Sequence, residues 1–154
     1  MTTAELESRI TPEMRAALLA AENDPYVCPI PGAKKIGEGT EKSAWLFNGV
    51  VVKHNNFLGH NKWRKPADEC LRNLDKKVRK YGARLATQVF IGDWVIQEYV
   101  KHRLDNDVPW NLVPESIKRL CAKVGFRGLT WDISYSNMGL TKLDGFGEYV
   151  VYDF

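Results

Sequence analysis

The chain has 154 residues, of which 44% are hydrophobic, 27% charged and 11% aromatic, and its formal net charge is +3. This size predicts one domain with a folded core and excludes wholesale disorder. No apolar run approaches the roughly 18 residues that cross a bilayer, and the N-terminus does not resemble a secretory signal, so no membrane partner is expected. Three widely spaced cysteines without a CxxC motif favour neither disulfides nor a zinc site, which indicates a reduced, cytoplasmic protein.

The first predicted element is a helix that begins at Thr11-Pro12-Glu13. This triplet offers a capping hydroxyl, a proline at the first helical position and an acid in the first turn. Asp24-Pro25 ends the helix, and a connector follows as far as Gly32. We therefore expect residues 1–32 to form a helical extension and connector, and residues 33–154 to form the main domain.

Residues 34–54 show the pattern of strands. Lys34–Ile36 leads into a glycine-containing turn, and Ser43–Phe47 is strand-like. Asn48-Gly49 is a strong hairpin signal, and Val50–Val52 is a β-branched return strand. The segment is therefore predicted to be a three-stranded meander.

The remaining elements alternate between helix and strand. A helix is expected over residues 66–81, with Cys70, Leu74 and Val78 among the apolar residues along one side and Gly82 as its stop. Next come strands over residues 85–91 and 94–100, a polar irregular stretch over 101–112 and a helix over 114–123. A loop that closes into a short strand follows over 128–140, and a final strand over 149–152. This order predicts an α+β fold.

Charge is distributed unevenly along the chain. Residues 60–84 contain nine Lys/Arg against three Asp/Glu, whereas residues 128–154 contain one Lys against four Asp/Glu. A positive middle and a negative end suit a phosphate ligand and a metal ion, respectively, although the basic run is also typical of the solvated face of a helix. Nucleic-acid binding by residues 62–84 is less favoured, because Trp63 and Tyr81 are the only aromatic residues interleaved in the basic run and no nucleic-acid motif is present.

Three features favour phosphate binding. Gly37 and Gly39 lack a Cβ atom, so backbone N–H groups there can approach phosphate oxygens, although two glycines are also typical of an ordinary turn. Lys53 ends an apolar strand, where its ammonium group either meets an anion or lies on a solvent-facing edge. Glu69, with Asp68 as the competing choice, could pair with Lys53 or with a neighbour on its own helix.

Two later motifs favour metal binding and phosphoryl transfer. Asp132 precedes Asn137 by five residues, a spacing that can bring a carboxylate and an amide oxygen to one reaction centre. Asp153 ends an apolar strand, where a carboxylate is well placed to hold Mg²⁺, a cation that prefers oxygen ligands. Alternatively, Asp132 caps a turn and Asp153 is merely terminal.

Taken in order, these motifs resemble those of the protein-kinase-like superfamily over roughly residues 34 to 154. The resemblance consists of IGEGT, VVVK, the helix bearing Glu69, VIQEYV, D-x-x-x-x-N and VVYDF. It implies an N-lobe made of an antiparallel sheet plus one helix, and a minimal C-lobe that carries the catalytic loop. The ligands implied are ATP and Mg²⁺.

The resemblance also implies a role for each matching residue. The catalytic residues implied are Asp132 as the base, Lys53 and its ion-pair partner Glu69. The nucleotide-binding residues implied are Gly37, Gly39, Thr40 and Lys53, together with the backbone of Glu98 and Val100 in the hinge that follows the gatekeeper position at Gln97. The metal ligands implied are Asn137 and Asp153.

Departures from the family pattern indicate a reduced or atypical kinase. The third glycine of the loop is missing, Thr130-Trp131-Asp132 stands in place of His-Arg-Asp, and we expect no peptide-binding helices because the sequence stops at Phe154. Two functions remain open: a phosphotransferase with an unknown acceptor, and an inactive pseudokinase-like module for regulation or scaffolding. An oligomeric partner, such as a second copy of the chain, could supply the acceptor surface.

Overall fold

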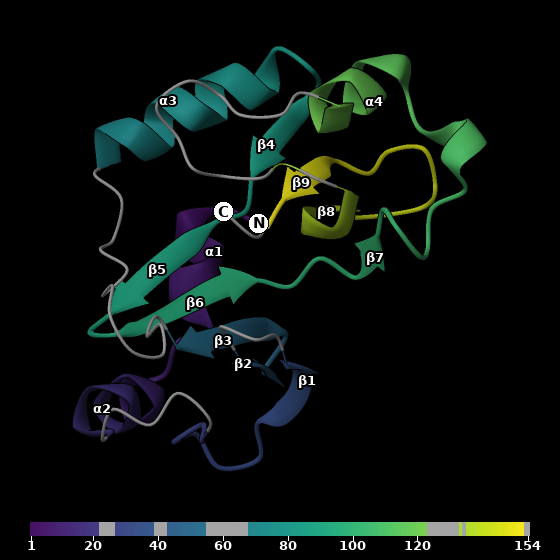
Figure 1. Ribbon diagram of the computed structural model, residues 1–154. Coiled ribbons are helices and arrows are strands. Elements are labelled where there is room, and N and C mark those ends of the chain that lie inside the picture. Colours follow the sequence, from purple (N-terminus) through teal and green to yellow (C-terminus); the bar gives the residue numbers. More distant parts are fainter. Residues whose placement is uncertain (22–26, 39–42, 55–67, 123–132, 134, 153–154) are drawn as a thin grey trace. The chain divides into compact units, whose positions relative to one another are not determined.

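The computed structural model describes residues 1–21, 27–38, 43–54, 68–122, 133 and 135–152. It is an α+β structure with two compact units (Figure 1). Unit 1 comprises Met1–Lys65 and Thr87–Tyr99, and unit 2 comprises Pro66–Ala86 and Val100–Phe154. Among the described residues, none of the helices combines the length and apolar character that a bilayer crossing requires. The predicted boundary between a helical extension and the main domain, near residue 32, stays a prediction.

Unit 1 contains a five-stranded sheet in which every neighbouring pair is antiparallel. Its strands, in spatial order, are β1 (Lys34–Glu38), β2 (Ser43–Phe47), β3 (Val50–His54), β6 (Trp94–Glu98) and β5 (Gln88–Ile91). The predicted meander is confirmed as β1 to β3. Asn48 and Gly49 have φ angles of 49° and 70°, which a two-residue hairpin turn of this kind requires.

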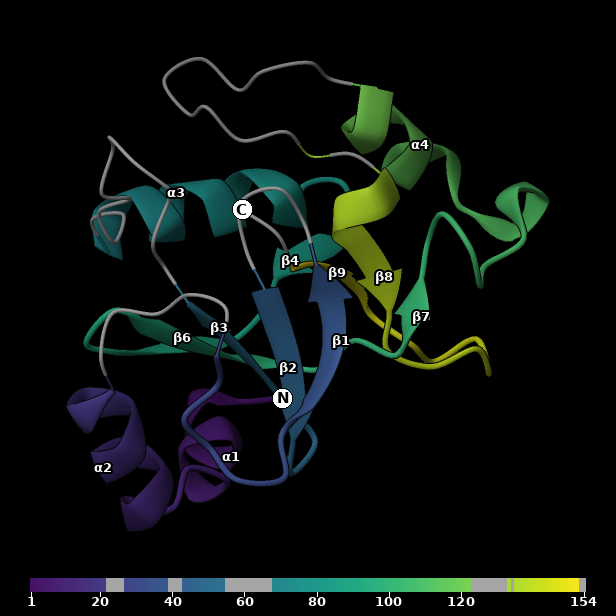
Figure 2. The ribbon, with the colours of Figure 1, turned by 60° about the horizontal axis from the view of Figure 1, so that its bottom comes forward.

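Two helices supply the core of unit 1. In α2 (Pro12–Ala20) the Thr11 side chain accepts a hydrogen bond from the Met14 amide at 3.1 Å, which confirms the predicted start. A shorter helix, α1 (Thr3–Ser8), was not predicted, although Thr2 and Glu5 form a capping box at its start. Both helices lie on one side of the sheet (Figure 2). Their apolar side chains form one core with those of the sheet, which includes Leu6, Ile10, Met14, Leu18, Trp45, Val50, Val52, Ile91, Trp94 and Ile96.

Unit 2 contains a four-stranded sheet of short strands. In spatial order they are β4 (Ala83–Leu85), β9 (Tyr149–Val151), β8 (Met138–Leu140) and β7 (His102–Arg103), and only the β4–β9 pair among them is parallel. The helices α3 (Asp68–Arg79) and α4 (Glu115–Ala122) bury Leu74 and Val78, and Ile117 and Leu120, respectively, in a core shared with β8 and β9. Short 3₁₀ turns, η1 (Trp110–Leu112) and η2 (Tyr135–Asn137), complete the unit.

The structure corrects the sequence prediction at several places. The strand expected over residues 85–91 is two strands, because the Ala86 amide donates to Val151 in the sheet of unit 2 and Thr87 accepts from the Glu98 amide in unit 1. The helix α3 belongs to unit 2, whereas it was expected to accompany the antiparallel sheet. Cys70, expected on its apolar side, is exposed.

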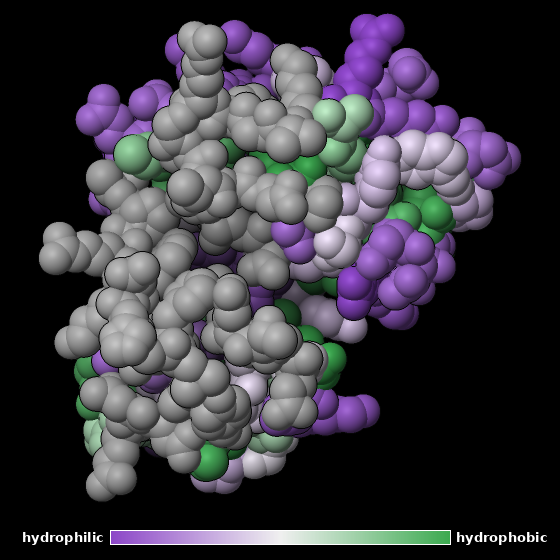
Figure 3. Space-filling model, viewed as in Figure 1, coloured by the Kyte–Doolittle hydropathy of each residue, from purple (hydrophilic) through white to green (hydrophobic). Residues whose placement is uncertain are grey.

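Large hydrophobic side chains on the surface come from several elements of both units, among them Leu19, Trp110 and Phe146. On the face shown in Figure 3, the coloured residues are mostly hydrophilic and the hydrophobic ones form small separate areas. Exposed apolar residues that are scattered singly are normal for a folded domain.

Candidate functional site

Lys53 lies on the face of the five-stranded sheet opposite to the one that α1 and α2 cover. Side chains alternate along a strand, so Val50 and Val52 enter the core with the helices while Val51 and Lys53 point to the other face. Across the sheet the same face carries Val95 opposite Lys53 and Gln97 opposite Val51. The result is an apolar sheet surface with an ammonium group at one end.

The register of the first three strands places Gly37 and Lys53 in one row. Gly37 pairs with Ala44, and Ala44 pairs with Lys53. A bulge in β1 makes this possible, because Ile36 is an extra residue between the pairs at Lys35 and Gly37. A Cβ atom added to Gly37 would meet only the Ala44 Cβ, at 4.0 Å, among the described residues. The other expected phosphate-loop residues, Gly39 and Thr40, lie outside the described residues.

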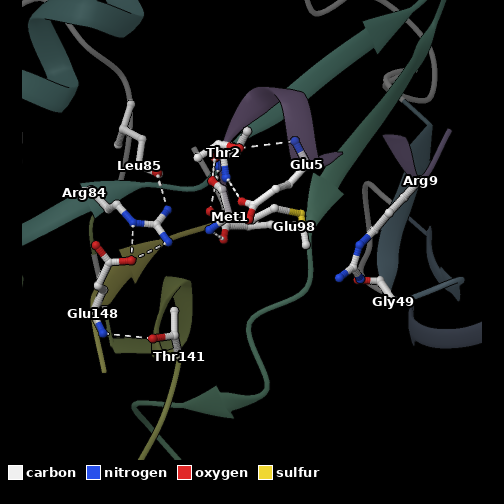
Figure 4. A network of polar contacts seen from close by, with 11 residues as sticks. Met1, Thr2, Glu5, Arg9, Gly49, Arg84, Leu85, Glu98, Thr141 and Glu148 are labelled. Atoms are coloured by element: carbon white, nitrogen blue, oxygen red, sulfur yellow. Dashed lines mark hydrogen bonds and ion pairs between the residues drawn. The ribbon is translucent and has the colours of Figure 1, made fainter. Parts of the chain in front are cut away.

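Glu98 ends β6 at the expected hinge, and both oxygens of its carboxylate have partners inside unit 1. One oxygen lies 3.2 Å from the Met1 amino group, and the other accepts from the Thr87 amide at 2.8 Å (Figure 4). The Glu98 amide donates to the Thr87 carbonyl at 3.0 Å, so a contact of Glu98 with adenine would use its carbonyl oxygen. Val100, the other expected hinge residue, begins unit 2 and is buried there beside Val150.

In unit 2, Asn137 is held directly beside the end of β9. It is the last residue of η2, and β8 follows it. The Tyr152 amide donates to the Asn137 carbonyl oxygen at 2.9 Å, which continues the antiparallel pairing of β8 with β9. Tyr152 directly precedes Asp153 in the sequence. The expected asparagine ligand and the residue before the expected aspartate ligand are therefore neighbours.

The two expected acids, Asp132 and Asp153, lie outside the described residues. Within the described residues, no three His, Cys, Asp or Glu side chains are gathered in a way that could hold a metal ion. Asp132 and Asp153 are two of the three residues implied in metal binding and catalysis, so the expected Mg²⁺ site stays a prediction.

Glu69 lies in the first turn of α3, where it is exposed. Further along α3, the buried side chains of Leu74 and Val78 pack in the core of unit 2. The Asp75 carboxylate accepts a hydrogen bond from the Leu85 amide at 2.9 Å, which connects α3 to β4. Because Glu69 belongs to unit 2 and Lys53 to unit 1, their expected ion pair stays a prediction. The same holds for the competing choice, Asp68.

A polar contact that sequence reasoning missed fixes the loop before β9. The buried Arg84 guanidinium donates to the Glu148 carboxylate at 3.0 Å and to the Leu85 carbonyl at 3.2 Å (Figure 4). Glu148 in turn donates its amide to the Thr141 hydroxyl at 2.9 Å, which closes the loop that joins β8 to β9. Arg84 had been counted with the basic run, and only the apolar residues on either side of it in β4 signal its burial.

Comparison with protein-family models finds no match, and comparisons with curated proteins and with solved structures find none either. The kinase-like resemblance accordingly rests on the sequence motifs alone and stays a prediction.

Proposed function

We propose that this chain binds ATP together with Mg²⁺ in the manner of a reduced kinase. The observation that carries the proposal is the row formed by Gly37, Ala44 and Lys53 on the face of the unit 1 sheet opposite to α1 and α2. A glycine near the end of a strand and a lysine at the same level of the sheet can contact one polyphosphate, the glycine through nearby backbone N–H groups and the lysine through its ammonium group. The apolar residues Val51 and Val95 beside the row suit a purine base.

The arrangement in unit 2 supports the metal part of the proposal. Asn137 lies beside Tyr152, the residue that precedes Asp153 in the sequence, and amide and carboxylate oxygens are ligands that Mg²⁺ accepts. In the proposed transfer, an acceptor hydroxyl attacks the γ-phosphorus, the bond to the β-phosphate oxygen breaks, and ADP leaves. Asp132 takes the hydroxyl proton.

The alternative is a nucleotide-binding module without transfer activity. It is favoured by Thr130-Trp131 at the positions where protein kinases have His-Arg, and by the missing third glycine. Both candidates require nucleotide binding, so binding is the first property to test. The acceptor, which the proposed transfer also requires, is a hydroxyl compound of unknown class.

Thermal unfolding with and without Mg-ATP tests the proposal. A ligand that binds only the folded state raises stability by about 2.7 kcal/mol at a hundredfold excess over Kd, so the melting temperature is expected to rise with Mg-ATP concentration. Lys53→Met should abolish most of this rise, whereas Lys76→Met, on the exposed side of α3, should preserve it. Absence of any rise at millimolar Mg-ATP in the unmodified protein refutes the proposal.

A further inference from the structure

Tyr152 is joined to the turn η2 by two hydrogen bonds. Its amide donates to the Asn137 carbonyl at 2.9 Å, and its phenol donates to the Ser136 carbonyl at 2.7 Å. The two acceptors are consecutive carbonyls of a three-residue turn. The backbone and the side chain of one residue thus fix the same short segment from two directions.

The ring of Tyr152 is itself held in place. It packs with Ala86, Val100 and Val150, and its Cε1 atom lies 3.4 Å from the position that a Cβ atom on Gly139 would take. The ring is half-buried, and its hydroxyl group reaches the turn. Because the ring is packed, its hydroxyl group has little freedom to move away from the Ser136 carbonyl.

We propose that Tyr152 is a positioning residue that holds Asn137 in the orientation needed to bind the metal. The inference rests on the proposed function, which makes Asn137 a Mg²⁺ ligand. A 3₁₀ turn has poor internal hydrogen-bond geometry, so it needs an external constraint to keep one conformation. Mg²⁺ demands near-ideal octahedral geometry, so a small rotation of Asn137 lowers metal affinity.

The phenol hydroxyl separates this role from simple packing. Tyr152→Phe keeps the ring in the apolar cluster and keeps the hydrogen bond from the backbone amide to the Asn137 carbonyl. It removes only the hydrogen bond from the phenol to the Ser136 carbonyl. Tyr149→Phe is the matched control: Tyr149 begins β9, three residues before Tyr152, is partly buried in the core with α3 and α4, and loses the same hydroxyl.

The experiment is a Mg²⁺ titration of ATP binding to the full chain and to both variants. Removal of a group that orients a metal ligand typically weakens metal binding by 10 to 100-fold. Tyr152→Phe should therefore raise the Mg²⁺ concentration at half-saturation by roughly tenfold, while ATP binding without Mg²⁺ is unchanged. Tyr149→Phe should leave both values as in the unmodified protein. Equal Mg²⁺ dependence in all three proteins overturns the inference.

A second measurement tests the positioning role without any ligand. Hydrogen exchange of the backbone amide of residue 152, which donates to Asn137, is expected to become faster in Tyr152→Phe and to stay unchanged in Tyr149→Phe. If the unmodified protein does not bind Mg-ATP, the proposed function fails on its own and this exchange rate still decides the positioning role. Unchanged exchange in Tyr152→Phe means that the phenol does not hold the turn.

Discussion

Gly139 in β8 shows how a single residue can set the packing of unit 2. A Cβ atom at this position would lie 2.5 Å from the Val100 Cγ1 atom and 2.7 Å from the His102 carbonyl oxygen. The backbone oxygen cannot move away without disturbing the pairing of β7 with β8. Gly139→Ala should therefore lower the free energy of unfolding by about 1–3 kcal/mol, the usual cost of overpacking. Urea denaturation measures this change.

Gly37→Ala is the control for this prediction. Its new Cβ atom would meet only Ala44 among the described residues, at an ordinary 4.0 Å, and Gly37 is not among the residues with positive φ. Replacing a strand glycine without a steric clash is neutral or slightly stabilising. Equal destabilisation by both substitutions would show that the close approach at Gly139 is not the cause.

The three cysteines are expected to react with thiol reagents at different rates. Burial raises the pKa of Cys121 to about 11, and burial also raises the pKa of Cys28. Since only the thiolate reacts, about one Cys121 side chain in a thousand is reactive at pH 8. Cys70 is exposed on α3. Mass spectrometry after brief alkylation at pH 8 should find Cys70 labelled first and Cys121 last, and equal labelling in the native protein would contradict this.

Among the elements, α2 depends on its first turn. The Thr11 hydroxyl accepts from the Met14 amide at 3.1 Å, and Pro12 follows at the first helical position. Thr11→Ala removes the cap and should lower the free energy of unfolding by about 1 kcal/mol, whereas Thr11→Ser, which keeps the hydroxyl, should cost much less. Equal melting temperatures for Thr11→Ala and the unmodified protein would show that the cap does not contribute to stability.

Elements with a local signal were predicted well, because their causes lie within a few residues. The hairpin at Asn48-Gly49 and the start at Thr11 follow from turn and cap chemistry that one short segment contains. The break of residues 85–91 into β4 and β5 has no such local cause. It arises because β4 pairs with β9, which lies more than sixty residues further along the chain, and sequence periodicity carries no information on such a partner.

At the scale of the whole chain, the sequence motifs predicted which residues form the site. The structure shows which residues lie next to some of these, within each unit. The bulge at Ile36 sets which face Gly37 shares with Lys53, and a bulge cannot be recognised from one sequence. The link between Asn137 and Tyr152 follows from the antiparallel pairing of β8 with β9, which the sequence analysis did not predict. Asp132, Gly39, Thr40 and Asp153 lie outside the described residues, so their roles stay predictions.

Asp132 separates the two functions that remain open for the chain. A carboxylate that accepts the hydroxyl proton affects the transfer step and contributes little to holding the nucleotide, and general-base catalysis typically contributes 10² to 10⁴-fold to the rate. An amide of the same shape cannot accept that proton at neutral pH. Asp132→Asn should therefore keep the rise in melting temperature with Mg-ATP and lose at least about a hundredfold in phosphoryl transfer.

Transfer can be measured with γ-labelled ATP as label released to water or incorporated into the protein itself. Asp144→Asn is the matched control, because Asp144 is an exposed acid in the same C-terminal region whose carboxylate accepts only the Phe146 amide in the described contacts. We expect transfer by the unmodified protein and by Asp144→Asn, and its loss in Asp132→Asn. If all three bind Mg-ATP and none transfers label, the chain is a nucleotide-binding module of the pseudokinase type, because binding then persists without the chemistry that Asp132 would support.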